Sequence, residues 1–422
     1  MDIFERIKQN PGAIGQWSKQ GHGYFMFPKL EGEIDAHMKF RGHDVLNWSL
    51  NNYLGLANNP EIRKMDVESV EKYGLSNPMG SRLMTGHNAL HEQLENEIAK
   101  FVQKEDAYVL NSFYQGVVSV IDCLCGRNDV FVYDPDVHSS VHDGIRLHPN
   151  NKRFTYLQNN FENLEVQMKN ACEFAEQQDG GVLLITEGIL GLTGELVPLD
   201  KIAKLKEKYN FRWIVCDPHG LGIMGATGIG AAEELGVQDK VDVHIGNFEK
   251  TIGLNGGFVA SEENIVNYLR YNMRSQTFSE ALSLINTTSA INRLLYIQKN
   301  PQLRKSLWNV TNALQRGLRK AGCDIGNTKS PITPIFISVH NMQEGLHLLM
   351  DLRENFNIFC VPIIFPYVQK GQILLRLIPT ATHSLEDVEF TVDAIKKVKE
   401  NLRVGKYRDD NPLTENNNKR ES

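Results

Sequence analysis

Short apolar runs alternate with amphipathic segments from residue 48 to about residue 283. The runs are rich in β-branched and aromatic residues and are bounded by turn residues: Ala107–Asn111, Val130–Tyr133, Val182–Thr186, Trp213–Cys216 and Val241–Ile245. The segments His91–Val102 and Leu199–Tyr209 instead repeat their apolar residues at the helical period. Strands separated by helices predict an α/β fold with a mostly parallel central sheet and helices on both of its faces.

A second pattern starts with a long helical stretch at Phe278–Lys299. It continues with predicted helices and strands in the order Gln302–Ala321, Ile332–Ser338 (strand), Met342–Asn355, Phe359–Ile364 (strand), Ile373–Leu377 (strand) and Leu385–Arg403. We therefore expect four parts: an N-terminal arm at residues 1–47, a large domain at 48–290, a smaller α+β domain at 291–405 and a disordered tail at 406–422.

Composition narrows the class of protein. Of the 422 residues, 41% are hydrophobic and 23% are charged, and the formal net charge of −6 comes from both signs mixed along the chain. A globular protein without a nucleic-acid-binding surface is expected. The six cysteines have neither disulfide nor zinc spacing, so we expect reduced thiols and no metal. The N-terminus lacks an apolar signal core, and no apolar run reaches the ~18 residues of a membrane helix. These features predict a cytoplasmic protein without an integral membrane segment.

Unusual polar residues follow the predicted strands, where ligands bind in open α/β sheets. These segments are Ser112–Gly116, the loop with His138, Glu187–Gly194, the run from Asp217 to His219, and Lys250 before a glycine-rich turn. Their order suits an aldehyde cofactor, which needs a cradled phosphate, a sandwiched ring, a partner for its ring nitrogen and a lysine for its carbonyl.

Each of these residues also has a structural interpretation. Lys250 is either a Schiff-base lysine or a surface lysine in a loop. Asp217 and His219 either bind a nitrogen heterocycle or serve as a helix cap and a packed imidazole. His138 either stacks on a planar cofactor or bonds to loop backbone. Arg376, inside an apolar strand, needs a carboxylate, which either a salt bridge or an anionic substrate can provide.

Longer motifs reveal a family resemblance that covers nearly the whole chain. From Asn51-Asn-Tyr-Leu-Gly-Leu to Leu375-Arg-Leu-Ile-Pro-Thr-Ala-Thr-His383, the chain resembles the α-oxoamine synthases. The matching motifs between these ends are Gly80-Ser-Arg-Leu-Met-Thr-Gly86, Asp143-Gly-Ile-Arg-Leu147, Thr186-Glu-Gly-Ile-Leu-Gly-Leu-Thr-Gly194, His219-Gly-Leu-Gly-Ile-Met-Gly-Ala-Thr-Gly228 and Gly256-Gly-Phe-Val-Ala. Within the family, the chain is most similar to the bacterial serine palmitoyltransferase type.

The resemblance implies a fold-type I enzyme dependent on pyridoxal 5'-phosphate, with the cofactor in the large domain. It implies a homodimer with shared active sites that condenses an acyl-CoA with a small amino acid and releases CO2. Lys250 resembles the Schiff-base lysine and base, and His138 the histidine stacked on the ring. His219 resembles the histidine near the phenolic oxygen, and Arg376, with Asn51 or Asn52, the clamp on the substrate carboxylate. The remaining positions implied to contact the cofactor are Ser112, Phe113, Tyr114, Glu187, Cys216, Asp217 and Asn247.

The chain departs from the family at this pocket. The aspartate that pairs with the ring nitrogen falls on Cys216, and Asp217 should face the other side of the sheet. Asn247 replaces a phosphate-binding hydroxyl residue, Glu249 a small residue and Phe113 a glycine, while Pro218 replaces the alanine under the ring.

Two functions therefore stay open, because the synthase motifs argue against a third, a fold-type I aminotransferase. The first is an acyltransferase of sphingolipid-type biosynthesis with serine as the first choice of amino acid, while glycine, alanine and cysteate remain open. The second is a catalytically impaired paralogue with a binding or regulatory role.

Overall fold

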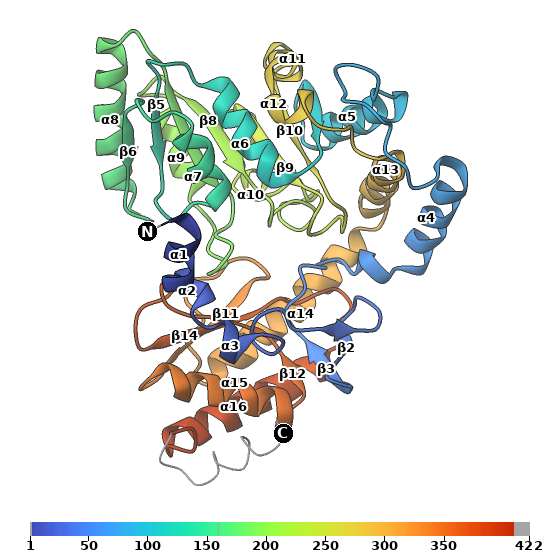
Figure 1. Cartoon of the computed structure of the whole chain (residues 1–422), viewed down its shortest axis with the longest axis vertical. Helices are drawn as coiled ribbons and strands as arrows, with labels where there is room; N and C mark the ends of the chain where they lie inside the picture. The colour runs from blue at the N-terminus through green and yellow to red at the C-terminus, as the bar shows by residue number, and fades with distance from the viewer. Residues whose placement is uncertain (1, 159, 409–422) are drawn as a thin grey trace. The chain divides into compact units, whose positions relative to one another are not determined.

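The computed structural model describes residues 2–158 and 160–408 (Figure 1). The chain divides into two compact units. Among the described residues, unit 1 comprises residues 2–50, 310–326 and 333–408, and unit 2 comprises 51–158, 160–309 and 327–332. The N-terminal segment predicted as an arm is thus grouped with the C-terminal part of the chain.

Unit 2 contains a seven-stranded sheet in the order β4-β10-β9-β8-β7-β5-β6. Its strands are β4 (Asp106–Leu110), β5 (Val130–Tyr133), β6 (Arg153–Thr155), β7 (Val182–Glu187), β8 (Arg212–Cys216), β9 (Val243–Asn247) and β10 (Gly257–Ser261). Strands β6, β5, β7, β8 and β9 pair in parallel, whereas β10 is antiparallel to both β9 and β4. The predicted mostly parallel sheet is confirmed, and β6 and β10 are strands that the hydrophobic pattern did not reveal.

The helices of unit 2 connect these strands. They are α4 (Pro60–Tyr73), α5 (Ala89–Phe101), α6 (Phe113–Leu124), α7 (Ser139–Arg146), α8 (Phe161–Gln177), α9 (Leu199–Leu205), α10 (Ala231–Glu234), α11 (Glu263–Asn272), α12 (Arg274–Thr277) and α13 (Leu284–Lys299), with short 3-10 turns at Leu56–Asn58 and Gln238–Lys240. Each of α4, α5 and α8 begins at an asparagine whose side chain accepts a backbone N–H of the first turn, which satisfies an otherwise unpaired donor.

One face of this sheet is covered by α6, α7 and α11. Its apolar cluster joins alternate residues of the strands, among them Ile185 of β7, Ile214 of β8 and Ile245 of β9, to side chains of these helices. Because successive side chains of a strand point to opposite faces, residues two positions further along each strand return to this same face. The alternation therefore determines which polar groups meet where the strands end.

Unit 1 contains a four-stranded sheet in the order β1-β2-β3-β12 and a three-stranded sheet in the order β11-β14-β13. Its strands are β1 (Leu30–Glu31), β2 (His37–Phe40), β3 (His43–Asn47), β11 (Thr333–Ser338), β12 (Ile358–Phe359), β13 (Val361–Ile363) and β14 (Gln372–Leu377). Its helices are α1 (Ile3–Gln9), α2 (Gly12–Gly15), α3 (Ser18–Gly21), α15 (Met342–Asn355) and α16 (Leu385–Arg403), and α14 (Pro301–Lys320) runs from unit 2 into unit 1.

The N-terminal segment belongs to unit 1 because it is hydrogen-bonded into it. Strand β3 pairs in parallel with β12, and the N–H of Leu46 donates to the carbonyl of Asn357 at 2.8 Å. Most of the predicted tail, residues 409–422, lies outside the described residues. Tyr407 is buried, and its hydroxyl bonds to Asp351 and Asn401, so the packed chain extends past residue 405.

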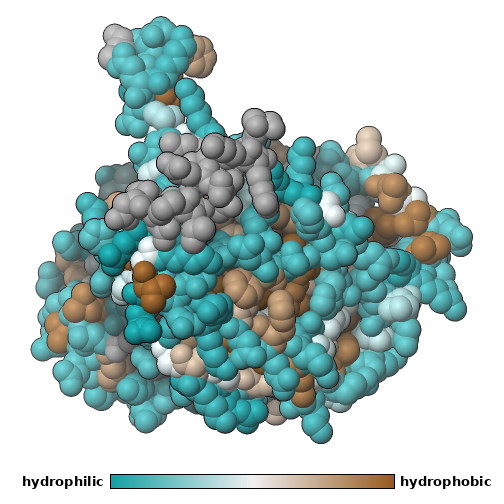
Figure 2. All heavy atoms as spheres, turned by 90° about the horizontal axis from the view of Figure 1, so that it is seen from below, coloured by the Kyte–Doolittle hydropathy of each residue, from teal (hydrophilic) through white to brown (hydrophobic). Residues whose placement is uncertain are grey.

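The described helices give no membrane span: none of them is both long and apolar enough to cross a bilayer. The face of the molecule in Figure 2 is mostly hydrophilic, with hydrophobic side chains in small separate groups.

A buried ion pair ties α5 to the sheet of unit 2. Arg82 donates to both carboxylate oxygens of Glu95, at 2.9 and 3.1 Å, and the N–H of Val109 in β4 donates to the same carboxylate at 2.9 Å. Both ionic side chains are at most 5% exposed. Removing one member of a buried pair leaves the other charge without compensation in a medium of low dielectric constant.

We predict that Glu95→Ala lowers the free energy of unfolding by about 3–5 kcal/mol, because Arg82 and the Val109 N–H both lose their acceptor. Urea denaturation followed by circular dichroism measures the change. Asp393→Ala, which breaks the exposed pair with Lys396, is the control and should leave the midpoint close to that of the wild type. Equal midpoints for the two variants would contradict the structural role assigned to Glu95.

Candidate active site

Three polar side chains meet on one face of the sheet where β7, β8 and β9 end. Alternate residues of a strand point to the same face of the sheet. On the face covered by α6, α7 and α11, the strands carry Ile185, Ile214 and Ile245. Two positions further along each strand, the same face carries Glu187, Cys216 and Asn247. Glu187 lies directly opposite Cys216 in the parallel register. All three polar side chains are buried.

Lys250 follows β9 and is held by the asparagine at the end of that strand. The hydrogen-bond network assigns the orientation of the Asn247 amide. Its nitrogen then donates to the carbonyl of Pro218 at 3.3 Å, and its oxygen accepts from Lys250 Nζ at 3.0 Å. The ammonium group also lies 6.0 Å from the centre of the Phe113 ring. Asn247 thus joins Lys250 to the loop that follows β8.

His138, between β5 and α7, faces the aromatic residues that begin α6. The ring centres of Phe113 and Tyr114 lie 6.1 and 5.8 Å from the His138 ring. Ser140 bonds to His138 Nδ1 through its hydroxyl at 2.8 Å. Part of the ring surface is open to solvent, yet desolvation, reinforced by the charge of Lys250, lowers the pKa of His138. A neutral imidazole is therefore favoured.

Glu187 accepts a hydrogen bond from the backbone N–H of His138. Burial raises the pKa of this carboxyl to about 8, against the opposing effects of that hydrogen bond and of the Lys250 charge. Burial also raises the pKa of the neighbouring Cys216 thiol, which is therefore neutral. The polar residues at the ends of β7 and β8 are thus a weak acid and an uncharged thiol.

Asp217 faces the other side of the sheet, as its position after Cys216 predicted. Its two carboxylate oxygens accept the N–H groups of Gly220, at 3.0 Å, and Ala231, at 2.6 Å. Burial raises the pKa of Asp217 to about 6, although both hydrogen bonds act in the opposite direction. A Cβ atom added at Gly188 would come within 2.4 Å of this carboxylate, so the glycine is needed for the close approach.

His219 is buried in the loop after β8 and is bonded to the segment that begins unit 2. Its Nδ1 lies 2.8 Å from the hydroxyl of Tyr53. Of the preceding asparagines, Asn52 accepts the N–H of Ala57 at 3.1 Å, whereas the buried side-chain oxygen of Asn51 has no hydrogen-bond partner among the described residues. Asn51 therefore has an acceptor that a ligand can satisfy.

The N-terminus of α6 carries a carboxylate from the loop after β9. Ser112 is the N-cap residue of this twelve-residue helix, but its side chain makes no capping hydrogen bond. The Phe113 N–H instead donates to Glu249 Oε1 at a long 3.4 Å. Helix N-termini attract anions because their N–H groups are unpaired and their dipole is positive. The exposed Glu249 side chain fills this role here.

Arg376 is the one predicted site residue that belongs to unit 1. It lies in β14, opposite Pro334 of β11 and Val361 of β13. Its neighbours Leu375 and Leu377 belong to the apolar core of unit 1, so Arg376 lies on the opposite face of that sheet. All other predicted site residues belong to unit 2.

Two residues of the site were missed by the sequence reasoning. Tyr53, which binds His219, lies inside the motif that begins with Asn51, but nothing in its local pattern pointed to a partner far along the chain. Ser140, which orients His138, could have been found from its place in the first turn of a helix, where serine often bonds locally.

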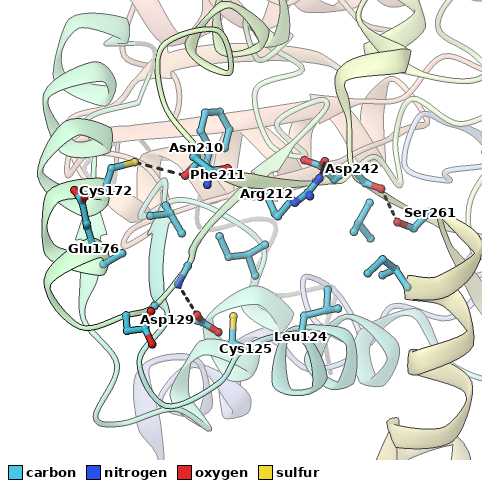
Figure 3. Close-up of a pocket in the computed structure, with 18 of the residues that line it drawn as sticks. Leu124, Cys125, Asp129, Cys172, Glu176, Asn210, Phe211, Arg212, Asp242 and Ser261 are labelled. Atoms are coloured by element: carbon cyan, nitrogen blue, oxygen red, sulfur yellow. Dashed lines mark hydrogen bonds and ion pairs between the residues drawn. The ribbon is translucent and has the colours of Figure 1, made fainter.

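The large cavity in Figure 3 lies where the strands begin, at the other edge of the sheet from the site residues. It has a volume of about 810 Å³, and its lining includes Asp129, Val182, Arg212 and Asp242. Val182 and Arg212 begin β7 and β8, whereas the site residues end them. Because ligands of open α/β sheets bind beyond the carboxyl ends of the strands, we do not assign this cavity to the candidate active site.

Metal binding has no support in the part of the chain that the structure describes, where no group of three or more His, Cys, Asp or Glu side chains could hold an ion. All six cysteines are free thiols in the structure. The groups of the candidate site are a lysine, two imidazoles, a buried acid and the N-terminus of α6.

Comparison with known proteins extends over nearly the whole chain. The family model for aminotransferase class I and II matches residues 43–395. The chain is 47% identical over 407 residues to the cysteate-C-fatty acyltransferase of Capnocytophaga ochracea, covering 96% of each chain. It is 33% identical over 374 residues to a serine palmitoyltransferase of Bacteroides thetaiotaomicron, covering 89% of this chain and 92% of the relative.

A solved structure has the same fold. Serine palmitoyltransferase of Sphingomonas wittichii aligns with a TM-score of 0.87 at 24% identity and covers 96% of this chain and 100% of that one. Together with the strand-end lysine and the motifs of the sequence, these matches lead to one conclusion. The chain belongs to the aminotransferase class I and II family and, within it, to the α-oxoamine synthase group of fold-type I proteins.

Proposed function

We propose that this protein is a pyridoxal-phosphate-dependent C-acyltransferase that joins a fatty acyl thioester to a small amino acid and releases CO2. The observation that carries the proposal is the placement of Lys250 at the end of β9, bonded to Asn247 and close enough to His138 to lower its pKa. An amine held in this way next to a neutral imidazole suits the capture of an aldehyde beside a planar ring.

The residues present fit pyridoxal phosphate. Lys250 would bind the aldehyde carbon, His138 would stack on the ring, and the Tyr53–His219 pair would address the phenolic oxygen. The Ser112 hydroxyl, which makes no capping hydrogen bond, and the N–H groups at the start of α6 would hold the phosphate. When bound, the cofactor supplies an electron sink for negative charge that develops at the amino-acid α-carbon.

The protein's own groups would position the substrate and move its proton. Lys250 Nζ would take the α-proton and return a proton after CO2 has left. The Asn247 side-chain oxygen fixes Nζ at 3.0 Å and so limits the positions from which it can act. The side-chain oxygen of Asn51, which has no hydrogen-bond partner among the described residues, would help to orient the substrate.

For the amino acid we propose cysteate in place of serine. A relative that is 47% identical is named for cysteate, whereas the serine palmitoyltransferases reach 33%. Fatty acyl-CoA remains the proposed acyl donor.

We also propose a homodimer with shared active sites. Two loops of unit 2 are joined by a hydrogen bond from the Ala281 N–H to the Gly80 carbonyl at 3.0 Å. Around this bond they expose Met79, Met84 and Phe278, each at least 76% accessible. Exposed apolar side chains of this size are typical of interfaces, and a second copy of the chain would cover them.

A binding or regulatory role without catalysis is the competing proposal. It is supported by Cys216, Asn247, Glu249 and Phe113, which depart from the usual pocket of the family. We favour the acyltransferase because Lys250 lies close enough to His138 for its charge to act on the imidazole. Capture of an aldehyde beside a planar ring needs such an amine and imidazole side by side. The next two measurements separate the proposals.

We predict that the purified protein develops an absorbance band at roughly 410–430 nm with pyridoxal phosphate, as a protonated imine does. Lys250→Ala removes the amine that forms the imine and should abolish the band. Lys396→Ala, at an exposed position of α16, is the control and should keep it. A band of unchanged intensity in Lys250→Ala would show that another amine binds the aldehyde.

We predict that release of CoA from palmitoyl-CoA is faster with cysteate than with serine, by at least about tenfold in kcat/KM, equivalent to ~1.4 kcal/mol of transition-state stabilisation. Thiol titration of free CoA measures both rates in one preparation. Equal or faster turnover of serine would contradict the choice of cysteate. No turnover of either amino acid by protein that shows the imine band would favour the regulatory role.

We predict that Glu249→Ser strengthens binding of pyridoxal phosphate about two- to fivefold at low ionic strength, because it removes a carboxylate from the start of α6. Fluorescence titration measures the affinity. The gain should shrink as salt is added, because Glu249 is exposed. Pyridoxal without phosphate is the control, and its affinity should not change. Weaker binding of the phosphate form would mean that Glu249 supports the site.

A further inference from the structure

We propose that Glu187 is the acidic partner of the cofactor's ring nitrogen, replacing the aspartate that the family resemblance places at position 216. This inference rests on the proposed function and deepens it. Fold-type I enzymes of this kind need a protonated ring nitrogen if the ring is to accept electrons. An acidic group near the ring nitrogen must provide that proton.

Cys216 is poorly suited to the role. Its side chain is 2% exposed, and burial raises the pKa of the thiol, so it carries no negative charge. A thiol is a weak hydrogen-bond donor and a weak acceptor. It cannot form the ion pair that an aspartate forms with a pyridinium nitrogen.

The other carboxyl groups at the neighbouring strand ends face away. Asp217 points to the opposite face of the sheet, where both of its oxygens are bonded to backbone N–H groups. Asp134 follows Tyr133, which lies in the cluster under α6 and α7, so Asp134 also points to the opposite face. Its Oδ1 accepts the N–H of Asp136 at 2.8 Å.

Glu187 has the position and the length for the role. It lies opposite Cys216 in the register of two parallel strands, on the same face. Neighbouring strands are about 4.8 Å apart, and a glutamate side chain is one methylene longer than an aspartate. A carboxyl group that starts one strand away can therefore reach toward the space in front of Cys216.

The groups around Glu187 include two that would contact the cofactor. The backbone N–H of His138, the candidate stacking residue, donates to its carboxylate, and the charge of Lys250 acts on it. The described residues give this carboxyl no side-chain hydrogen bond. A buried acid with unused hydrogen-bonding capacity, flanked by the two groups that would contact a cofactor ring, is typical of a functional site.

The proton for the ring nitrogen can come from Glu187 itself. Burial raises the pKa of Glu187 to about 8, so at neutral pH the carboxyl retains its proton. With the cofactor bound, Glu187 would give that proton to the ring nitrogen and would remain beside it as a carboxylate. The pair formed is the one that the family obtains from its aspartate, and the step needs no further reactant.

The test compares pyridoxal phosphate with its deaza analogue, in which a C–H group replaces the ring nitrogen. Affinities of the wild type and of Glu187→Gln for both ligands are measured by fluorescence titration, with the imine band recorded alongside. We expect the wild type to prefer pyridoxal phosphate, and Glu187→Gln to lose at least tenfold of that preference. Adding Cys216→Asp to Glu187→Gln should restore it. Asp242→Asn, which removes a largely buried carboxylate at the other end of the strands, is the control and should keep it.

Because the deaza analogue reports the folded pocket independently of the ring nitrogen, a damaged fold cannot imitate the expected result. An unchanged preference in Glu187→Gln, or an equal loss of affinity for both ligands, would overturn the inference while leaving the proposed function intact. A wild-type protein that forms no imine with pyridoxal phosphate would instead overturn the proposed function, and the role of Glu187 with it.

Discussion

The alternation of side chains along β7, β8 and β9 is the constraint on which the rest of the site depends. Isoleucines on these strands anchor one face of the sheet under α6, α7 and α11. Their spacing sends Glu187, Cys216 and Asn247 to that face and Asp217 to the other. A shift of one residue in any strand would exchange these groups and move the site to the wrong side of the sheet. The apolar core thus determines which polar groups can act together.

The charged groups at the ends of these strands differ from those that the family resemblance implies. The end of β8 carries a neutral thiol, while a buried acid stands at the end of β7. At the end of β9, an asparagine binds the lysine, and a glutamate beside that lysine reaches the start of α6. Of the residues that depart from the family, Asn247 bonds to Lys250, and Phe113 contacts both Lys250 and Glu249. These substitutions suit a reorganised cofactor site, in which neighbouring residues take over lost interactions, better than unrelated losses.

Much of this arrangement could be predicted from the sequence. Five of the seven strands in the sheet of unit 2 and the orientation of Asp217 follow from hydrophobic runs and their period of two. The antiparallel strand β10 could not, because Gly257–Ser261 is short and begins with glycine. The place of the N-terminal segment depends on pairing of β3 with β12, more than 300 residues away. The bond between Tyr53 and His219, and that between Glu249 and α6, likewise join segments that no local pattern relates.

The central claim is that the amine of Lys250 captures the aldehyde of pyridoxal phosphate. Borohydride reduction of the loaded protein makes the imine permanent, and peptide mass spectrometry then locates the modified lysine. The account predicts one pyridoxyl-phosphate group per chain, on the peptide that contains Lys250. Modification spread over exposed lysines such as Lys396, or a single site on a different lysine, would contradict it.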